Sequence, residues 1–373
     1  MTIFLENQFV CRFSVANYTD FILLEDLREL TYIETAGNVL PVMTLKFVLR
    51  DMDIANFLNQ GNIFNMSIGR TQLDLIDMQF LLIGDNMASD WNVNSTVTIQ
   101  GVLYVPQYSL VDRTDVHADM TSFEVIETVT MPYFKFKSNA KKVNDKMNWH
   151  QLNVNDKAFL RKVWLHSYIN SDTFLAFAVD CDTVYFKDIK AALTYETPWR
   201  FTISGVSSES SKLIHYGQVF VKNDYGTTSR IAGQLTDVYD TDLTFGNTKI
   251  TNPTLKNLTT LDTNKLNVLA KDNSQKQFTY SSSEYHPRYH QAYNQNVKNL
   301  VMFSTLRSYI SIAGQFKTLK LLDLVNIDND SPDPRNTGLG FVTGLVYQIK
   351  DKRLVTNITI CKEGANGMQG DLR

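Results

Sequence analysis

The stretch from Val154 to Leu193 constrains the fold more than any other part of the chain, because it combines a helix with strands that can cover it. Asn155 or Asp156 can cap this helix, since either short side chain accepts a hydrogen bond from amides left free in a first helical turn. Spacings of one, four and five residues place four apolar side chains on one helix face and leave basic residues toward water. The apolar residues are Phe159, Leu160, Val163 and Trp164, and the basic ones are Lys157, Arg161 and Lys162.

The residues after this helix have the pattern of a β-hairpin. Phe174 to Val179 gives a first strand, Asp180-Cys181-Asp182 a turn, and Thr183 to Phe186 a returning strand. The apolar face of the helix needs a surface to pack against, and the hairpin supplies one. We therefore expect one compact α/β unit, which ends in a short turn of helix before Leu193.

Most of the remaining chain has the period-two alternation of strands with one buried face. This alternation runs from Gln8 to Tyr104, with a short helical turn at Ile54 to Leu58, and it resumes from Leu213 to Lys222. Several short strands at this spacing, separated by turn residues, indicate closed or nearly closed barrels. The later strand candidates are Tyr309 to Ile312, Thr318 to Ile327, Phe341 to Ile349 and Leu354 to Cys361, with a turn at Lys350-Asp351-Lys352-Arg353.

Between the two barrel-like regions, Pro106 and the polar run after it mark a boundary. Thr121-Ser122-Phe123-Glu124 forms a capping box, in which the Thr121 hydroxyl and the Glu124 carboxylate each bond a free backbone amide. It predicts a helix that runs to about Val129. Met131 to Lys137 is a strand candidate, and Lys141 to Trp149 has the composition of a polar connection.

Thr241 to Ser283 is rich in Thr, Asn and Lys and poor in aromatic residues, so we interpret it as an irregular insertion or a peripheral subdomain. Pro287 suits a first helical position and predicts a helix within 286–303. The fold class is then α+β, mainly β, with two β-barrel domains that bracket an α/β domain. The predicted parts are a first barrel at 1–111, an α/β domain at 112–205, a second barrel split between 206–240 and 306–373, and an insertion at 241–305.

Composition excludes several classes of function. The 373 residues are 43% hydrophobic and 20% charged, which is typical of a folded chain with several domains. A net charge of -3 implies no bulk attraction to nucleic acid. The cysteines Cys11, Cys181 and Cys361 lie too far apart to indicate a disulfide framework or a clustered metal site, and they fit synthesis in a reducing cytoplasm. We expect neither a signal peptide nor a membrane span, because Glu6 interrupts the apolar N-terminus and no run of about 18 apolar residues occurs.

Several residue pairs have the spacing of a site but lack the rest of one. His286 and His290 stand four apart on the predicted helix, after Glu284, but the His-Glu-x-x-His order and a third metal ligand are missing. We expect these histidines to pack or to lie at a helix end.

The remaining candidates lack the context of a phosphate loop, a nucleophile elbow or a calcium loop, so we interpret them as turns and solvated acids. They are Ser204-Gly205-Val206-Ser207, Gly338-Leu339-Gly340, the pair Asp180 and Asp182, and the pair Asp328 and Asp330. Aromatic residues make up 12% of the chain but follow the apolar strand pattern, which indicates burial in a core or interface. We assign no catalytic, cofactor-binding or metal-binding residue, and we expect no enzyme.

The α/β unit resembles the central module of bacteriophage tail hub proteins, the baseplate hub of contractile tails. It is similar also to the N-terminal hub part of type VI secretion spike proteins. The likeness is carried by Phe159-Leu160-Arg161 on a helix, the hairpin with its Asp-rich turn, and the capping-box helix that precedes Met147-Asn148-Trp149. The closing segment from Gly338 to Gly364 looks like the family's last hairpin, and the order of barrel, α/β module and interrupted barrel matches along nearly the whole chain.

The resemblance implies a homotrimer with two similar tube-type barrels in each subunit, so that three chains form a ring of six units. Such a ring would adapt a sixfold tail tube to a threefold central spike and form part of the genome-delivery channel. The implied partners are the chain itself, a tail tube or tube-initiator protein, a central spike protein and other baseplate proteins, with DNA or a tape-measure protein in transient passage. The implied location is the virion tail baseplate, assembled in the cytoplasm of a host bacterium. The chain carries no spike repeats, so a separate spike chain is expected.

Two other classes stay open at this point. A β-rich receptor-binding or glycan-binding tail protein would present an exposed aromatic platform. A tail-associated peptidoglycan hydrolase would need a catalytic acid pair, and none is placed in a way that predicts lysis of cell walls.

Overall fold

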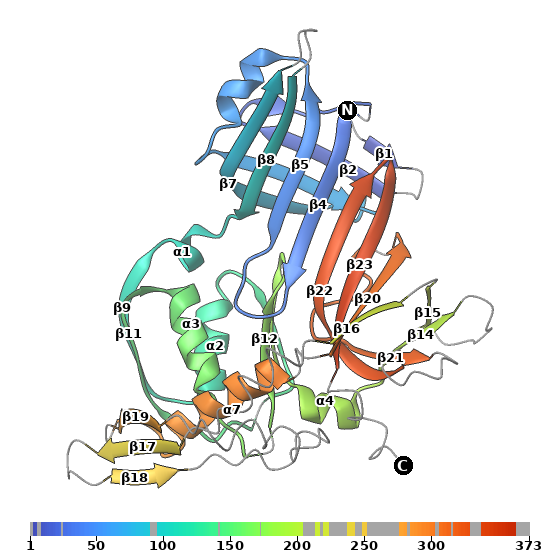
Figure 1. Ribbon diagram of the computed structural model, residues 1–373. Helices are drawn as coiled ribbons and strands as arrows, with labels where there is room; N and C mark the ends of the chain where they lie inside the picture. Colours follow the sequence, from blue (N-terminus) through green and yellow to red (C-terminus); the bar gives the residue numbers. More distant parts are fainter. Residues whose placement is uncertain are drawn as a thin grey trace.

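The computed structural model (Figure 1) is built mainly of strands, with the α-helices gathered toward one end and one short 3-10 helix at the other. The described residues are 3–5, 9–23, 25–89, 95–140, 142–171, 173–203, 213–216, 219–223, 237–242, 248–251, 276–281, 284–302, 306–314, 316–328 and 337–362. Among these residues, no helix has the length and the apolar character needed to cross a membrane.

The first sheet half, β1 to β8, follows the alternation of the sequence. In β8 (Ser95–Leu103) every second residue is buried, as expected for a strand with one face on a core. The strands lie in the antiparallel order β1, β2, β6, β7, β8, β5, β4 and fold over one another around a core of phenylalanines (Figure 1). The other strands are β1 (Ile3–Leu5), β2 (Phe9–Val15), β3 (Tyr18–Thr19), β4 (Leu27–Thr35), β5 (Val42–Leu49), β6 (Ile63–Gly69) and β7 (Ile76–Ser89). The predicted helical turn is confirmed as the 3-10 helix η1 (Met52–Phe57).

The second sheet half contains β14 to β16 and β20 to β23. Its last hairpin turns at Asp351 and Lys352, which both have positive φ, and this confirms the predicted turn. The strands are β14 (Trp199–Ile203), β15 (Leu213–Tyr216), β16 (Val219–Asn223), β20 (Leu306–Ala313), β21 (Leu324–Asp328), β22 (Gly338–Lys350) and β23 (Arg353–Lys362).

The two sheet halves are joined edge to edge by β4 and β22. Residues 344–350 of β22 pair antiparallel with 29–35 of β4, while the same strand pairs with β23 along its other edge. All these strands therefore belong to one fifteen-stranded sheet. The mainly β class is confirmed, but two separate closed barrels are not: among the described residues no sheet closes, because β4 gives its second edge to β22 and not to a strand of its own half.

The α/β part of the chain, with elements α1 to α4 and β9 to β13, is called the middle domain below. It lies against this sheet and contains the predicted helix and hairpin. Both hydrogen bonds of the capping box are present at the start of α2 (Ser122–Thr130). Asn155, and not Asp156, caps α3 (Asp156–Leu165), because its side chain accepts from the Ala158 amide at 2.9 Å. The four predicted apolar residues of α3 are buried. The remaining elements are α1 (Pro106–Ser109), β9 (Asp112–Met120), β10 (Lys135–Ser138), β11 (Met147–Asn155), β12 (Leu175–Val179), β13 (Thr183–Asp188) and α4 (Ile189–Tyr195).

Three element predictions in and near this domain need correction. The expected strand Met131 to Lys137 starts only at Lys135, because Tyr133 and Phe134 donate to the Thr130 carbonyl and extend the end of α2 as turns. The expected polar connection before Trp149 ends inside β11, which pairs with β9 as a two-stranded ribbon. The expected strand Thr318 to Ile327 starts at Leu324, because positive φ at Lys317 and Leu322 makes the preceding residues a loop.

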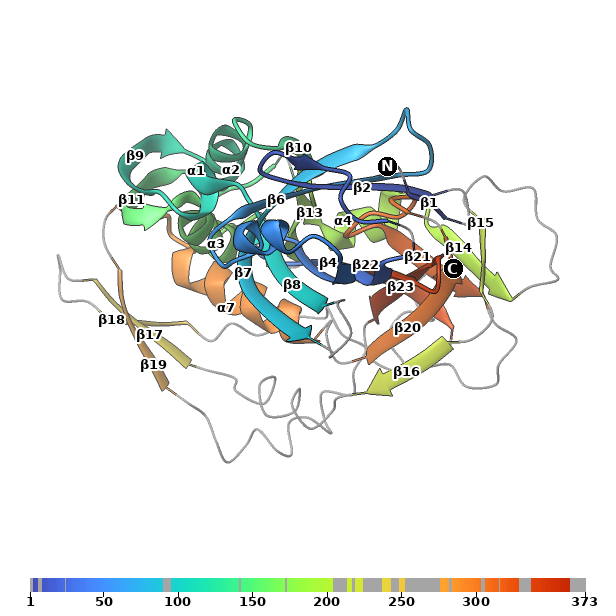
Figure 2. The ribbon, with the colours of Figure 1, turned by 90° about the horizontal axis from the view of Figure 1, so that it is seen from above.

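A small sheet lies at the edge of the molecule, with β17 between β18 and β19 (Figures 1 and 2). Strands β18 and β19 come from the predicted insertion, but residues 237–240 of β17 come from the segment that we assigned to the second barrel. A peripheral subdomain is thus the interpretation that fits the described residues of the insertion. Helix α7 starts at Tyr289, three residues after the predicted start at His286, and it packs on the middle domain. The Asn296 side-chain amide donates to the carbonyls of Leu165 and Ser167 at 3.1 and 2.9 Å, and so satisfies acceptors just after α3. The elements are β17 (Asp237–Asp242), β18 (Thr248–Thr251), β19 (Lys276–Ser281) and α7 (Tyr289–Met302).

Candidate functional site at the junction of the three parts

The two sheet halves and the middle domain meet where β4 ends. Ala36 forms a bridge with Ala178 of β12–β13, and the Gly37 amide donates to the Phe177 carbonyl at 2.6 Å. The buried Asn38 side chain then donates to the Lys157 carbonyl at 2.5 Å and accepts from the Tyr108 hydroxyl at 2.8 Å. These contacts fasten the end of β4 to three elements of the middle domain.

A buried ion cluster occupies the same junction. Lys317, from the loop before β21, donates to Glu34 of β4 and lies 3.9 Å from an oxygen of Asp180 in the β12–β13 turn. The side chains of Glu34 and Asp180 are only 1% and 6% exposed. The Tyr32 hydroxyl donates to Glu34 at 2.6 Å, and the Lys317 ammonium lies 5.6 Å from the centre of the Tyr32 ring. One side chain thus connects all three parts of the chain.

The electrostatics of this cluster follow from one cation that faces two carboxylates. Burial by itself lowers the pKa of Lys317, but Glu34 and Asp180 raise that pKa well above its usual value, so the ammonium stays charged. Burial raises the pKa of Glu34, and the attraction of Lys317 offsets this only in part. The Oδ1 atom of Asp180 accepts from the Thr183 amide at 2.7 Å, and Oδ2, the oxygen that faces Lys317, accepts from the Tyr185 hydroxyl at 3.1 Å. The cluster is held by hydrogen bonds on every side.

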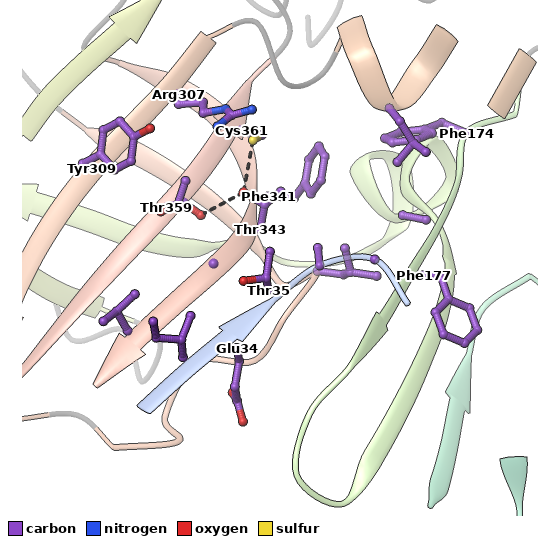
Figure 3. A pocket seen from close by; sticks show the side chains of 18 residues that line it. Glu34, Thr35, Phe174, Phe177, Arg307, Tyr309, Phe341, Thr343, Thr359 and Cys361 are labelled. Carbon is purple, nitrogen blue, oxygen red and sulfur yellow. Dashed lines mark hydrogen bonds between the residues drawn. The ribbon is translucent and has the colours of Figure 1, made fainter. Parts of the chain in front are cut away.

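Next to this cluster lies a cavity of about 340 Å³ between the sheet and β12. Phe174 and Phe177 line it from the middle domain, and Phe341 and Thr343 line it from β22 (Figure 3). The Thr343 hydroxyl is within 3.1 Å of the Cys361 sulfur, and the pair marks the β22–β23 side of the cavity (Figure 3). The junction is therefore tightly bonded at the ion cluster and loosely filled beside it.

The two sequence-predicted acids of the hairpin turn differ, because only Asp182 is exposed to solvent as expected. Asp180 is buried in the ion cluster, which corrects the expectation. Asp182 is half-exposed and pairs with Lys135 at 2.7 Å. Burial raises the pKa of the Cys181 thiol between them to about 12, so it stays protonated at neutral pH. Donor groups already occupy the oxygens of both acids, and a protonated thiol is a poor ligand, so this trio does not fit a metal ion.

The predicted histidines lie away from the junction and have separate partners. His286 is 4% exposed, with Nε2 at 3.0 Å from the His166 carbonyl and Nδ1 accepting from the Arg288 amide at 3.3 Å. Glu284 instead lies 3.4 Å from a ring nitrogen of His150. His290 packs its ring edge against Tyr289. The structure therefore does not bring the three candidate ligands to one point.

The structure describes some of the other candidate loops and acids. Gly338 to Gly340 is not a turn but the start of β22, where it pairs with β21. A side chain at Gly340 would meet the Cys361 carbonyl at 2.7 Å, which explains the glycine. Asp328 pairs with Arg200 at 2.7 Å. Ser204 to Ser207 and Asp330 lie outside the described residues.

No family model and no curated protein sequence matches the chain. Solved structures do match it over nearly its whole length. A tail protein from Neisseria meningitidis MC58 is 9% identical, with a TM-score of 0.57 over 96% of this chain and 97% of that one. The 43 kDa tail protein of prophage MuSo2 from Shewanella oneidensis is 8% identical, with a TM-score of 0.54 over 96% and 98%. This chain has the tail-protein fold.

A third match extends this fold to secretion systems. A component of the Escherichia coli type VI secretion system, described as similar to tail proteins of bacteriophage T4, is 9% identical to this chain. Its TM-score is 0.51 over 95% of this chain and 78% of that one. The resemblance inferred from the sequence is thus confirmed as a resemblance of fold.

Sequence reasoning missed the residues that tie this tail-protein fold together at its junction. The signal for Glu34 was present, because Leu30, Tyr32 and Glu34 share the buried phase of one strand, and a carboxylate there needs a partner. The residues around Lys317 in the sequence do not mark it as the partner of Glu34, and the two residues are 283 positions apart.

Proposed function

We propose that the chain is a structural hub protein of a phage tail baseplate that assembles as a homotrimer and has no catalytic role. The observation that carries the proposal is the edge-to-edge joining of two sheet halves within one chain, in a fold shared with tail proteins. Three copies would then present six β units in a ring. Such a ring can match a sixfold tube on one side and a threefold spike on the other.

The junction supports this role, because a ring of six units needs a fixed relation between the two halves of each chain. The β4–β22 pairing and the buried cluster around Lys317 both restrict motion of one half against the other. The proposed partners are further copies of the chain, a tube or tube-initiator protein, a spike protein and other baseplate proteins. DNA or a tape-measure protein would pass through the ring, and the proposed location is the tail baseplate of the virion.

Exposed apolar side chains are the proposed contact points for assembly. Leu73, in the loop between β6 and β7, is 99% exposed although the loop is ordered by hydrogen bonds between Thr71 and Asp74. Leu152 and Val116, on the outer face of the β9–β11 ribbon, are 65% and 49% exposed. Assembly would remove the apolar surface of these side chains from water, which is why we propose them as contact points.

The test is the mass and symmetry of the purified chain. Light scattering coupled to size-exclusion chromatography should give three times the chain mass, and averaged electron-microscope images should show a threefold ring with a sixfold-like rim. A glycan array serves as the control for a receptor-binding role and should stay blank. Monomers at high concentration, with and without a co-expressed spike protein, would contradict the hub role.

A further inference from the structure

We propose that the loop at 316–323 is a latch: with Lys317 in place it fixes the angle between the sheet and the middle domain, and without Lys317 the middle domain rocks on the sheet. The latch acts within one chain, so it needs no partner and does not depend on the proposed hub role.

The latch loop contacts all three parts of the molecule. Toward the first sheet half, Lys317 pairs with Glu34, and the neighbouring Thr318 hydroxyl accepts from Arg70. Toward the second half, the Leu322 amide donates to the Val342 carbonyl at 2.8 Å. Toward the middle domain, the Lys187 ammonium of β13 donates to the Leu322 carbonyl at 3.3 Å. Release of this loop would therefore remove bonds between the middle domain and the sheet, while the β4–β22 pairing still joins the two sheet halves.

Two features of Lys317 distinguish a latch from ordinary packing. Its φ is +55°, a left-handed conformation that is unfavourable for a residue with a Cβ. Its ammonium group is buried beside two carboxylates. Apolar residues of similar volume can often replace such a buried ion cluster without loss of stability. Strain of this kind persists only where the surroundings over-determine it, and here Glu34 and Asp180 supply that constraint.

The cavity beside the cluster gives the middle domain room to move. It has a volume of about 340 Å³ and is lined by Phe177 of the middle domain and Thr343 of β22 (Figure 3). At its border Phe174 and Phe341 remain in edge-to-face contact, with ring centres 5.9 Å apart. Next to it, the end of β4 holds β12 through the Ala36–Ala178 bridge and the Gly37–Phe177 bond. The hinge of this motion is the end of β4, where residues 36–38 are fastened to the middle domain, and the ion cluster restrains rotation about it.

The test compares Lys317→Met with Lys135→Met by hydrogen exchange of the full chain, followed by mass spectrometry. Lys135 is a matched control, because it pairs with Asp182 in the same β12–β13 turn, but the two side chains are 73% and 49% exposed. In Lys317→Met we expect exchange at least tenfold faster in peptides covering 33–37, 178–184 and 316–323. Peptides from β5, β8 and α2 should keep wild-type rates, and Lys135→Met should resemble wild type throughout.

A uniform rise in exchange across all peptides of Lys317→Met would overturn the latch, because it would mean that the cluster only adds to global stability. Unchanged exchange at the three junction peptides would overturn it too. Glu34→Gln is the second variant and decides the matter if Lys317→Met does not fold, since the amide oxygen can still accept from Lys317 and Tyr32. Glu34→Gln should speed exchange in the same three junction peptides, but by a smaller factor. Exchange that rises uniformly in this variant, or that does not change, would overturn the latch.

Discussion

The carboxylate of Asp145 offers a sharp test of how the middle domain is held together. Asp145 is fully buried and accepts three hydrogen bonds: from the Ser122 amide at 2.9 Å, the Ser122 hydroxyl at 2.5 Å and the Tyr168 amide at 2.8 Å. It thereby joins the first turn of α2 to the loop after α3. Burial raises the pKa of this carboxyl, and the three donors offset that shift only in part.

We expect Asp145→Ala to lower the free energy of unfolding of the middle domain by about 4 kcal/mol. The Ser122 hydroxyl can turn toward another acceptor, but two backbone amides lose their partner, and each buried orphan donor costs about 2 kcal/mol. Asp145→Asn should cost roughly half as much, about 2 kcal/mol, because the amide oxygen still accepts from one of the two backbone amides.

Urea unfolding, followed by the fluorescence of Trp149 and Trp164 in the middle domain, measures these changes. The matched control is Lys146→Ala, which removes an exposed pair with Asp119 next in sequence and should cost less than about 0.5 kcal/mol. If Asp145→Ala costs less than about 1 kcal/mol, or no more than Lys146→Ala, then the hydrogen bonds do not hold α2 in the way described here.

Three further outcomes are expected. Leu73→Asp should leave the melting temperature unchanged, because that side chain is 99% exposed, but it should lower the trimer fraction in light scattering; an unchanged trimer would remove this loop from the interface. Thr121→Ala removes the hydroxyl of the capping box and should lower the free energy of unfolding in urea by about 1 kcal/mol. An unchanged free energy would mean that this cap does not stabilise α2. Burial lowers the pKa of His286 from 6.5 to about 4. As the pH falls below 6.5, the unfolded chain binds a proton at this histidine and the folded chain does not. The free energy of unfolding therefore decreases between pH 6.5 and pH 4. Between pH 7.5 and pH 5 the wild type should therefore lose about 2 kcal/mol more than His286→Gln, and parallel pH profiles would contradict this.

The sequence predicted those parts of the fold that local patterns decide. The capping box at Thr121 and the apolar face of α3 are set by residues within a few positions of one another, and both are confirmed. The β9–β11 ribbon escaped prediction because β9 is largely polar. Arg113, Asp115 and His117 occupy one face of this strand, where alternation would require apolar side chains.

Non-local contacts explain what the sequence could not predict. The alternation of apolar and polar residues predicts that β4 and β22 are strands. It is equally compatible with closure of each sheet half into a barrel and with pairing between the two halves. The choice between the two depends on which edges meet in the folded chain, and no local signal encodes it. The ion cluster is hidden for the same reason, since Glu34, Asp180 and Lys317 come from three distant segments.

The pairing of β4 with β22 has a consequence for synthesis of the protein. The Gln348 side chain donates to Glu29 across this pair, and the two residues are 319 positions apart. While a ribosome is still translating the chain, β4 is already exposed but its partner strand does not exist. An unpaired strand edge is a template for aggregation, so nascent or truncated chains that end before Gly338 carry a hazard that the finished protein has removed.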